Sequence, residues 1–218
     1  MRTILCYGDS NTWGYQPSTG ERFPADVRWT GVLKRELGEG YSVLEEGLNG
    51  RTTIWEDPIY EHRNGKTYLL PCLESHRPLD LVIILLGLND LKRRVTRSAS
   101  DIAEGAGVLV DLVQRSGTGS GGSAPQVLLL APPHIGALTE LYEMFAGAEQ
   151  ASRQFPFHFR RIARERRCAF LDTSEVIVSS DRDGIHLEAG EHAKLGKAVA
   201  PLVQQLCPPL LDGEKEAL

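Results

Sequence analysis

Residues 81–90 read Leu-Val-Ile-Ile-Leu-Leu-Gly-Leu-Asn-Asp, a run of large apolar side chains that ends at a glycine and then turns polar. A strand that is apolar on both faces is typical of the centre of a parallel sheet covered by helices on each side. The run therefore predicts a central parallel strand over residues 79–86.

Short apolar runs and longer amphipathic stretches alternate on both sides of this strand. Further strands are predicted over residues 3–7, 41–44, 126–131 and 168–171, and helices over 29–37, 99–114, 140–166 and 189–206. This alternation predicts a parallel α/β sandwich with right-handed crossovers. We expect one domain over residues 1–207 and a tail over 208–218 that frays, because the tail carries two prolines and mixed charges.

The charge balance argues against a nucleic-acid partner. The chain of 218 residues has a formal net charge of -5, which provides no chain-wide basic field for phosphate backbones. Local basic clusters occur at residues 92–94 and 160–167, and we expect both on solvated helix faces. The alternative, an interaction protein that uses its arginine-rich helix, predicts salt-sensitive binding to nucleic acid.

The lengths of the apolar runs and the positions of the cysteines indicate the cellular compartment of the protein. The run at residues 3–7 is too short for the core of a signal peptide, and no segment approaches the length of a membrane span. Cys6 and Cys168 lie in predicted strands, so buried reduced thiols are expected. A cytoplasmic protein without a membrane partner is the resulting expectation.

No metal or other cofactor is expected from the histidines. His192 lies six residues after His186, whereas ligand pairs on a helix are spaced three or four apart, and no third ligand is evident.

Four polar blocks follow the predicted strands or precede the last helix. They are residues 8–12 (Gly-Asp-Ser-Asn-Thr), 47–53 (Gly-Leu-Asn-Gly-Arg-Thr-Thr), 87–90 (Gly-Leu-Asn-Asp) and 183–186 (Asp-Gly-Ile-His). In open parallel sheets, reactive residues gather at the carboxyl ends of the strands. We therefore expect these blocks to meet at one edge of the sheet.

Together the blocks supply the parts of an acyl-transfer site. A serine hydroxyl becomes nucleophilic when an imidazole takes its proton, and a carboxylate orients that imidazole, which points to Ser10, His186 and Asp183. A tetrahedral intermediate needs donors for its oxyanion, and the candidates are the backbone N–H groups of Ser10 and Gly50 and the side-chain amide of Asn89.

Each block also has a purely structural interpretation. The pair at residues 9–10 can be a helix N-cap, residues 89–90 and 183–184 can be turns, and His186 can be a satisfied histidine at a helix start. Asp172, which also follows a strand, is interpreted as a cap rather than a second triad acid. Four further residues are candidate walls of the substrate pocket, with core packing as the competing interpretation: Trp13, Tyr15, Trp55 and His134.

The four blocks, in this order, resemble the SGNH (GDSL-type) hydrolase family over residues 8–186. The Gly-x-Ser-x-Gly signature of α/β-hydrolases is absent. The resemblance implies a three-layer α/β/α sandwich with a central parallel sheet, the flavodoxin-like fold of that family. It also implies that Ser10 is the nucleophile, that Asp183 and His186 complete the triad, and that Gly50 and Asn89 belong to the oxyanion hole.

Residues 27–33, 45–48 with 51–53, and 183–186 are similar to the bacterial arylesterase/acyltransferase subgroup. This similarity implies hydrolysis of small acetyl-type esters through an acyl-enzyme, acyl transfer to alcohols, and a homo-oligomer that can reach an octamer. Two positions beside the oxyanion hole depart from the subgroup and are further pocket candidates: Leu88 stands where threonine is common, and Asn49 with Gly50 replaces a serine-alanine pair. The alternatives are a carbohydrate acetyl esterase and a catalytically silent binding module on the same fold.

Overall fold

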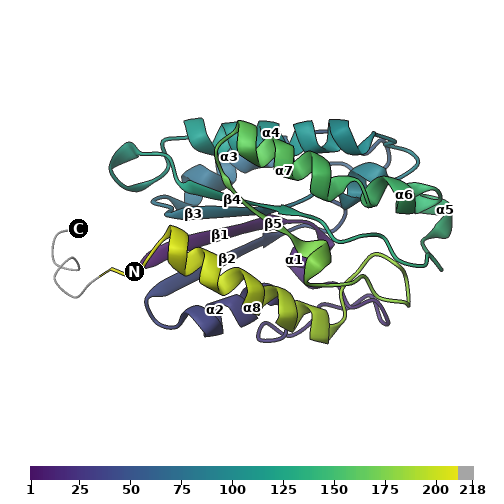
Figure 1. Cartoon of the computed structure of the whole chain (residues 1–218), viewed down its shortest axis with the longest axis horizontal. Coiled ribbons are helices and arrows are strands. Elements are labelled where there is room, and N and C mark those ends of the chain that lie inside the picture. Colours follow the sequence, from purple (N-terminus) through teal and green to yellow (C-terminus); the bar gives the residue numbers. More distant parts are fainter. Residues whose placement is uncertain (211–218) are drawn as a thin grey trace.

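Five parallel strands form one sheet with the order β2-β1-β3-β4-β5 (Figure 1). The structure, a computed structural model, describes residues 1–210. The strands are β1 (Arg2–Gly8), β2 (Tyr41–Gly47), β3 (Leu81–Leu85), β4 (Gln126–Ala131) and β5 (Ala169–Asp172). β3 lies between β1 and β4 and all five of its residues are buried, as its apolar sequence predicts.

Helices cover both faces of the sheet, so the predicted three-layer α/β/α sandwich is confirmed (Figure 1). One layer contains α2 (Trp29–Leu37) and α8 (Ala189–Leu206), and the other contains α3 (Gly65–His76), α4 (Ala99–Arg115) and α7 (Phe155–Glu165). Side chains alternate across the sheet between these layers. In β1, Ile4 and Cys6 pack with α2 and α8, whereas Leu5 and Tyr7 pack with the other layer.

Short elements connect the strands and helices. They are α1 (Ser10–Trp13), α5 (Tyr142–Phe145), α6 (Ala148–Ser152), and the 3₁₀ helices η1 (Leu88–Leu91), η2 (Ser120–Gly122) and η3 (Thr173–Glu175). Asp172 accepts a hydrogen bond from Ser174 N and caps η3, in agreement with its interpretation as a cap.

The prediction of one continuous helix over 140–166 is wrong. The segment forms α5, α6 and α7 instead. Gly147 adopts the left-handed conformation, with φ of 84°, immediately before α6. Pro156 lies in the first turn of α7, where its missing N–H leaves no helix bond unmade.

Helix α3 was not predicted from the sequence. It contains Pro71 in its interior, and the large apolar side chains of Tyr68 and Leu70 lie on its exposed face, so the apolar period in its sequence is weak. Its first turn is capped by the side chain of Asn64, which accepts a hydrogen bond from Lys66 N.

Topology brings three of the polar blocks to one edge of the sheet. The register aligns Gly8 of β1 with Gly47 of β2 and with Leu85 of β3, so the three strands end together. From the central pair β1 and β3, the chain adds β2 on one side of the sheet and β4 and β5 on the other. The strand order therefore reverses between β1 and β3, and open α/β sheets bind ligands at such a point. The fourth block, residues 183–186, reaches the same edge just before α8.

Close packing of α8 on α2 fixes the segment that carries this fourth block. Gly196 lies against α2 so closely that an added Cβ would be 2.7 Å from the carbonyl oxygen of Trp29. The Trp29 side chain is fully buried between the layers, and its backbone N–H donates to Nδ1 of His192. His192 is therefore a packing residue beneath the site.

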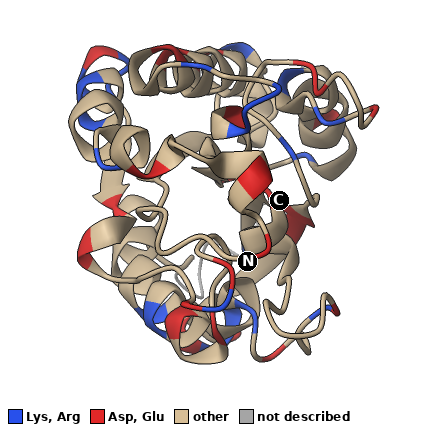
Figure 2. Ribbon diagram, turned by 90° about the vertical axis from the view of Figure 1, so that its right-hand side faces the viewer, with Lys and Arg blue, Asp and Glu red and all other residues tan. Residues whose placement is uncertain are grey.

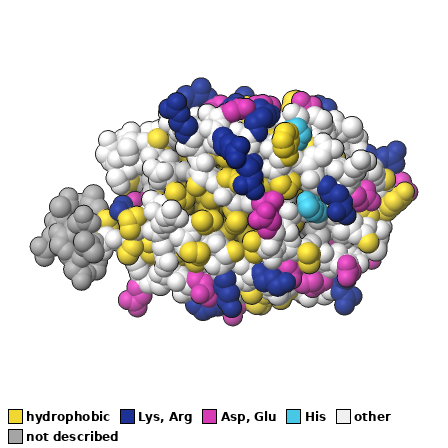
Figure 3. Space-filling model, in the orientation of Figure 1, with side chains coloured by type: hydrophobic (Ala, Val, Ile, Leu, Met, Phe, Trp, Pro, Cys, Tyr) yellow, Lys and Arg dark blue, Asp and Glu magenta, His cyan; other side chains and the backbone are white. Residues whose placement is uncertain are grey.

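Charges of both signs are mixed over the described surface. Figure 2 shows Lys and Arg interspersed with Asp and Glu along the ribbon, and Figure 3 shows the same mixture on the face in view. In the cluster at 160–167, Arg161 and Arg166 form ion pairs with Glu104 on the neighbouring α4, which agrees with a solvated helix face.

None of the helices in the described residues combines the length and the apolarity that a bilayer crossing requires. The one-domain organisation over 1–207 remains a prediction. Residues 211–218 of the predicted tail lie outside the described part of the chain.

Candidate active site

Ser10 begins a four-residue helix that follows β1 directly. Asp9 caps this helix by accepting a hydrogen bond from Asn11 N at 3.0 Å, so the capping interpretation of the Asp9-Ser10 pair is correct for Asp9. The close approach of this helix to β2 depends on Gly47, because a Cβ there would lie 2.1 Å from the backbone nitrogen of Trp13. Ser10 itself is held at the end of the sheet and is 6% exposed.

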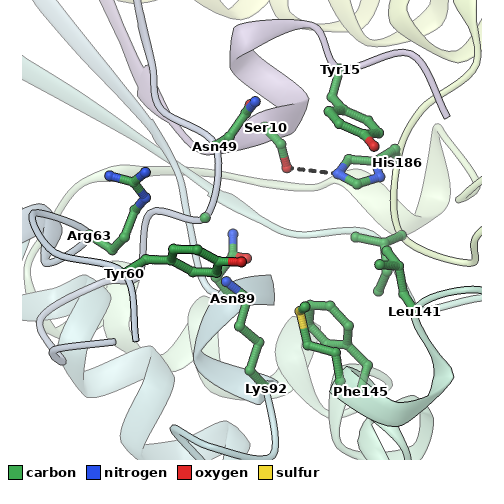
Figure 4. Close-up of a pocket in the computed structure, with 13 residues that line it drawn as sticks. Ser10, Tyr15, Asn49, Tyr60, Arg63, Asn89, Lys92, Leu141, Phe145 and His186 are labelled. Carbon is green, nitrogen blue, oxygen red and sulfur yellow. Dashed lines mark hydrogen bonds between the residues drawn. The ribbon is translucent and has the colours of Figure 1, made fainter. Parts of the chain in front are cut away.

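His186 and Asp183 complete a hydrogen-bonded relay from Ser10. Nε2 of His186 lies 3.0 Å from Oγ of Ser10 (Figure 4). Nδ1 of His186 lies 2.6 Å from Oδ2 of Asp183. The other carboxylate oxygen accepts from the backbone N–H groups of Ile185 and His186, each at 2.9 Å. The turn at residues 183–184 is thus also present, and it aims Asp183 at the imidazole.

Electrostatics keep Asp183 ionised. Burial opposes its charge, but the hydrogen bond and the charge of His186 together with the two backbone donors outweigh burial and lower the pKa of Asp183 below its usual value. An ionised carboxylate at this position fixes the tautomer with the proton on Nδ1, which leaves Nε2 free to accept the proton of Ser10.

Asn89 lies at the end of β3 on the other side of Ser10, in the 3₁₀ helix η1. Its Nδ2 is 3.4 Å from Oδ2 of Asp9, which orients the amide. Burial raises the pKa of Asp9 to about 6, although the backbone N–H of Asn11 partly opposes this rise.

Gly50 lies in the loop after β2 and has a φ of 82°, a conformation that glycine adopts without strain. This loop is tied to η1 because Asp90 accepts hydrogen bonds from the backbone N–H and the hydroxyl of Thr53. Within the described residues, the backbone N–H groups of Ser10 and Gly50 donate no hydrogen bond. They are therefore available to a bound oxygen.

A cavity of about 300 Å³ opens over Ser10 and His186. Of the six predicted pocket residues, Tyr15 and Asn49 line it. The ring of Tyr15 stacks on the imidazole of His186 with centroids 4.0 Å apart, which restrains the imidazole. Figure 4 shows Tyr15 directly beside His186, on the side of the cavity opposite Lys92.

The structure does not bring the other four predicted pocket residues to this cavity. Leu88 is 2% exposed and belongs to the core between the sheet and α4. Trp13 packs under the guanidinium of Arg22, and Trp55 packs under that of Arg97. The carbonyl of His134 accepts a hydrogen bond from Ser179. Contacts elsewhere therefore account for the side chains of Leu88, Trp13 and Trp55, and the assignment of all four residues to this cavity is corrected.

The prediction that the basic cluster at 92–94 lies on a solvated helix face is wrong for Lys92. This residue is 4% exposed and lines the cavity. The loop at 55–63 and the segment at 141–145 add further lining residues that periodicity could not fold. These are Tyr60, Arg63, Leu141, Met144 and Phe145.

Asn11 is a site residue that sequence reasoning missed. Its Nδ2 donates to the carbonyl of Ile185, and its Oδ1 accepts from Leu187 N at 3.1 Å. These two bonds attach the segment that carries His186 to the helix that carries Ser10. The only available signal was its position directly after Ser10 in the first polar block.

One group of three potential metal ligands lies away from this site in the described residues: Glu46, Cys72 and His76. Nε2 of His76 is already 2.8 Å from a Glu46 oxygen, and burial raises the pKa of Cys72 to about 12. In the described structure, Glu46 and His76 form a hydrogen-bonded pair beside the buried Cys72. All four cysteines have free thiols.

The sequence and the fold are both similar to those of known proteins. A sequence model of the GDSL-like lipase/acylhydrolase family matches residues 6–193. A search of curated proteins returned no match. Among solved structures, a carbohydrate acetylesterase from Sinorhizobium meliloti is 40% identical with a TM-score of 0.91, over 94% of this chain and 100% of that chain.

Two further solved structures are similar over the same extent. The aryl esterase of M. smegmatis is 42% identical with a TM-score of 0.91, over 94% of this chain and 100% of its own. A carbohydrate acetylesterase family member from Sinorhizobium meliloti is 35% identical with a TM-score of 0.89, over 94% and 99% of the two chains. Because the family match runs from the end of β1 to α8 and includes Ser10, Asn89 and His186, this chain belongs to the GDSL-like lipase/acylhydrolase family.

Proposed function

We propose that this chain is a serine esterase that hydrolyses small, short-chain (acetyl-type) carboxylic esters through an acyl-enzyme. The observation that carries the proposal is the relay from Ser10 through His186 to Asp183, with distances of 3.0 Å and 2.6 Å. Such a relay is the arrangement in which a serine hydroxyl becomes a nucleophile at neutral pH. The similar aryl esterase and carbohydrate acetylesterases support the same reaction class.

The proposed reaction has two steps. In the first, Oγ of Ser10 attacks the ester carbonyl carbon while its proton passes to Nε2 of His186. The carbon–oxygen bond to the alcohol then breaks, and the alcohol leaves with that proton. In the second, water or another alcohol gives its proton to His186 and attacks the acyl-enzyme, which releases the acid or a new ester and returns the proton to Ser10.

Three donors are proposed to stabilise the oxyanion in both steps: the backbone N–H groups of Ser10 and Gly50 and the side-chain amide of Asn89. Their support is the absence of competing acceptors for the two N–H groups in the described residues and the orientation of Asn89 by Asp9. The cavity of about 300 Å³ is at the small end of ligand pockets, which supports a short acyl group.

The direct test is hydrolysis of a chromogenic acetyl ester by the wild type and by Ser10→Ala. By analogy with other triad enzymes, kcat should fall by about 10⁴-fold or more. Ser75→Ala is a matched control, because this hydroxyl only bonds the carbonyl of Cys72 at the end of α3. Equal rates for the wild type and Ser10→Ala would refute the proposal.

A second candidate is a carbohydrate acetyl esterase, favoured by the similarity to the Sinorhizobium meliloti enzyme. The same site chemistry serves both, so the substrates must discriminate them. A higher kcat/KM on an acetylated oligosaccharide than on an aryl acetate would favour the carbohydrate substrate. A catalytically silent module would hydrolyse neither.

Assembly, acyl transfer and compartment belong to the proposal as well. We expect a homo-oligomer of up to eight copies, which analytical ultracentrifugation would measure. The exposed apolar side chains of Ile59 and Tyr142 support a contact between copies of the chain. Added alcohol should divert the acyl group to a new ester. The four free thiols support a cytoplasmic location.

A further inference from the structure

The cavity over Ser10 has an uneven distribution of charge. Its lining includes two cationic side chains, Arg63 and Lys92, and, within the described residues, no carboxylate. Figure 4 shows Arg63 at the left of the cavity and Lys92 at its lower edge, with Phe145 next to Lys92 and Leu141 at the right. The part of the lining with Arg63 and Lys92 is therefore suited to an anion, and Leu141 and Phe145 form an apolar wall for a hydrocarbon.

Lys92 is a buried cation whose nearest carboxylate already has a partner. Both oxygens of Asp57 accept hydrogen bonds from Arg94, each at 2.8 Å, whereas Nζ of Lys92 is 3.4 Å away. One negative charge thus lies between two positive ones. Because the side chain of Lys92 is 5% exposed, water screens its charge poorly.

A second carboxyl, Asp9, lies behind the site. It does not line the cavity, and it accepts hydrogen bonds from Asn11 and Asn89. Asp9 therefore moderates the field of Lys92 without occupying the space in front of the ammonium group.

Arg63 adds a second positive charge at the same point. Its NH1 donates to the carbonyl of Glu61 at 2.9 Å, and no carboxylate in residues 1–210 is within ion-pair distance of it. Nε of Arg63 and Nζ of Lys92 are each 3.4 Å from the position that a Cβ on Gly50 would occupy. Both cations therefore converge beside a proposed oxyanion donor.

We propose that the preferred substrate is an ester that carries a separate carboxylate, which Lys92 and Arg63 bind while the hydrocarbon portion contacts the apolar wall. This inference rests on the proposed esterase function and names the substrate class for the same site. A guanidinium and an ammonium group that share one carboxylate form charge-assisted hydrogen bonds, which are the strong ones in a partly buried pocket. A neutral acetyl ester leaves Arg63 without a carboxylate partner and Lys92 with only the Asp57 carboxylate that it shares with Arg94.

The carboxylate can belong to the acyl part or to the alcohol part of the ester. Two substrate pairs distinguish these sources. The first compares the 4-nitrophenyl monoester of glutaric acid with 4-nitrophenyl pentanoate, and the second compares 4-acetoxybenzoate with 4-acetoxybenzamide. The measured quantity is the ratio of kcat/KM, anionic to neutral, after subtraction of the uncatalysed rate.

We expect the wild type to favour the anionic member of at least one pair by roughly tenfold or more, the effect of one charge-assisted hydrogen bond. Lys92→Met and Arg63→Gln should each lower that ratio severalfold, and the double variant should remove the preference. Added salt should also lower it. Arg93→Gln is the matched control, since this neighbouring arginine is exposed and carries the same charge.

Several outcomes would overturn the inference. A ratio near one in both pairs for the wild type would do so, as would equal losses on anionic and neutral esters in the variants, because the cations would then act on the chemistry common to both. If Lys92→Met does not fold, Arg63→Gln at its half-buried position decides the question alone. Hydrolysis of none of the four esters would refute the esterase function itself, a result distinct from hydrolysis without charge preference.

Discussion

Asp183→Asn should remove most of the activity while leaving the fold in place. The two backbone N–H groups that bond Oδ1 of Asp183, those of Ile185 and His186, can bond the amide oxygen of asparagine equally well. The turn that presents the side chain is therefore kept. What changes is the contact to Nδ1 of His186, where an amide NH₂ replaces the carboxylate oxygen at 2.6 Å.

The magnitude follows from that single contact. With a donor facing Nδ1, His186 adopts the tautomer with its proton on Nε2, which cannot accept the proton of Ser10. The equivalent change in a serine-protease triad lowers kcat by about 10⁴-fold, or about 5 kcal/mol of transition-state stabilisation. We expect a loss of the same order here.

The assay is kcat for a chromogenic acetyl ester at neutral pH, with thermal unfolding to verify the fold. Asp172→Asn is the matched control, because Asp172 also follows a strand but caps η3 through Ser174. A loss of less than about tenfold in folded Asp183→Asn would show that the carboxylate does not set the tautomer of His186, and the relay would have to be abandoned.

Three further predictions concern the oxyanion donors and the fold. Asn89→Ala should lower kcat by roughly 10²–10³-fold in the same assay, and an unchanged kcat would exclude this amide from the oxyanion hole. Gly196→Ala should lower the free energy of unfolding, measured in urea, by about 1–3 kcal/mol, because the new Cβ would lie 2.7 Å from the carbonyl oxygen of Trp29. Gly190→Ala is the control and should leave the free energy of unfolding unchanged, because nothing lies near its Cβ position. Equal effects of the two substitutions would contradict the close packing of α8 on α2. Burial raises the pKa of Asp90 from 3.8 to about 7, so the folded state binds more protons than the unfolded state in this range and its stability falls as pH rises through it. Asp90→Asn should flatten that decline in urea unfolding, and an unchanged slope would contradict it.

Much of the fold could be predicted because the sheet is buried on both sides. Apart from the first two residues of β1 and the first of β4, every position in β1, β3 and β4 is buried, so their apolar sequences alone identify them. The helices were harder to predict from the sequence than the strands. Pro71 inside α3 and the Gly147 break in 140–166 are tolerated or imposed by tertiary packing, which local patterns do not contain.

In the candidate site, the residues that could be predicted are those that lie at the ends of strands or directly before the last helix. Ser10, Asn89 and His186 follow or precede elements whose positions were predictable, and parallel topology brings them together. Lys92 was assigned to a solvated face because a short basic cluster looks the same whether its lysine is buried or exposed. Its burial depends on Asp57, from a loop that no periodic pattern folds.

The central claim is that Ser10 is the residue that becomes acylated. Treatment with a fluorophosphonate, followed by intact mass measurement and peptide mapping, tests it without any assumption about the physiological ester. We predict one adduct per chain, on the peptide that contains Ser10, and none in His186→Ala, which lacks the base that activates the hydroxyl. No adduct on the folded wild type, or an adduct on a different serine, would contradict the claim.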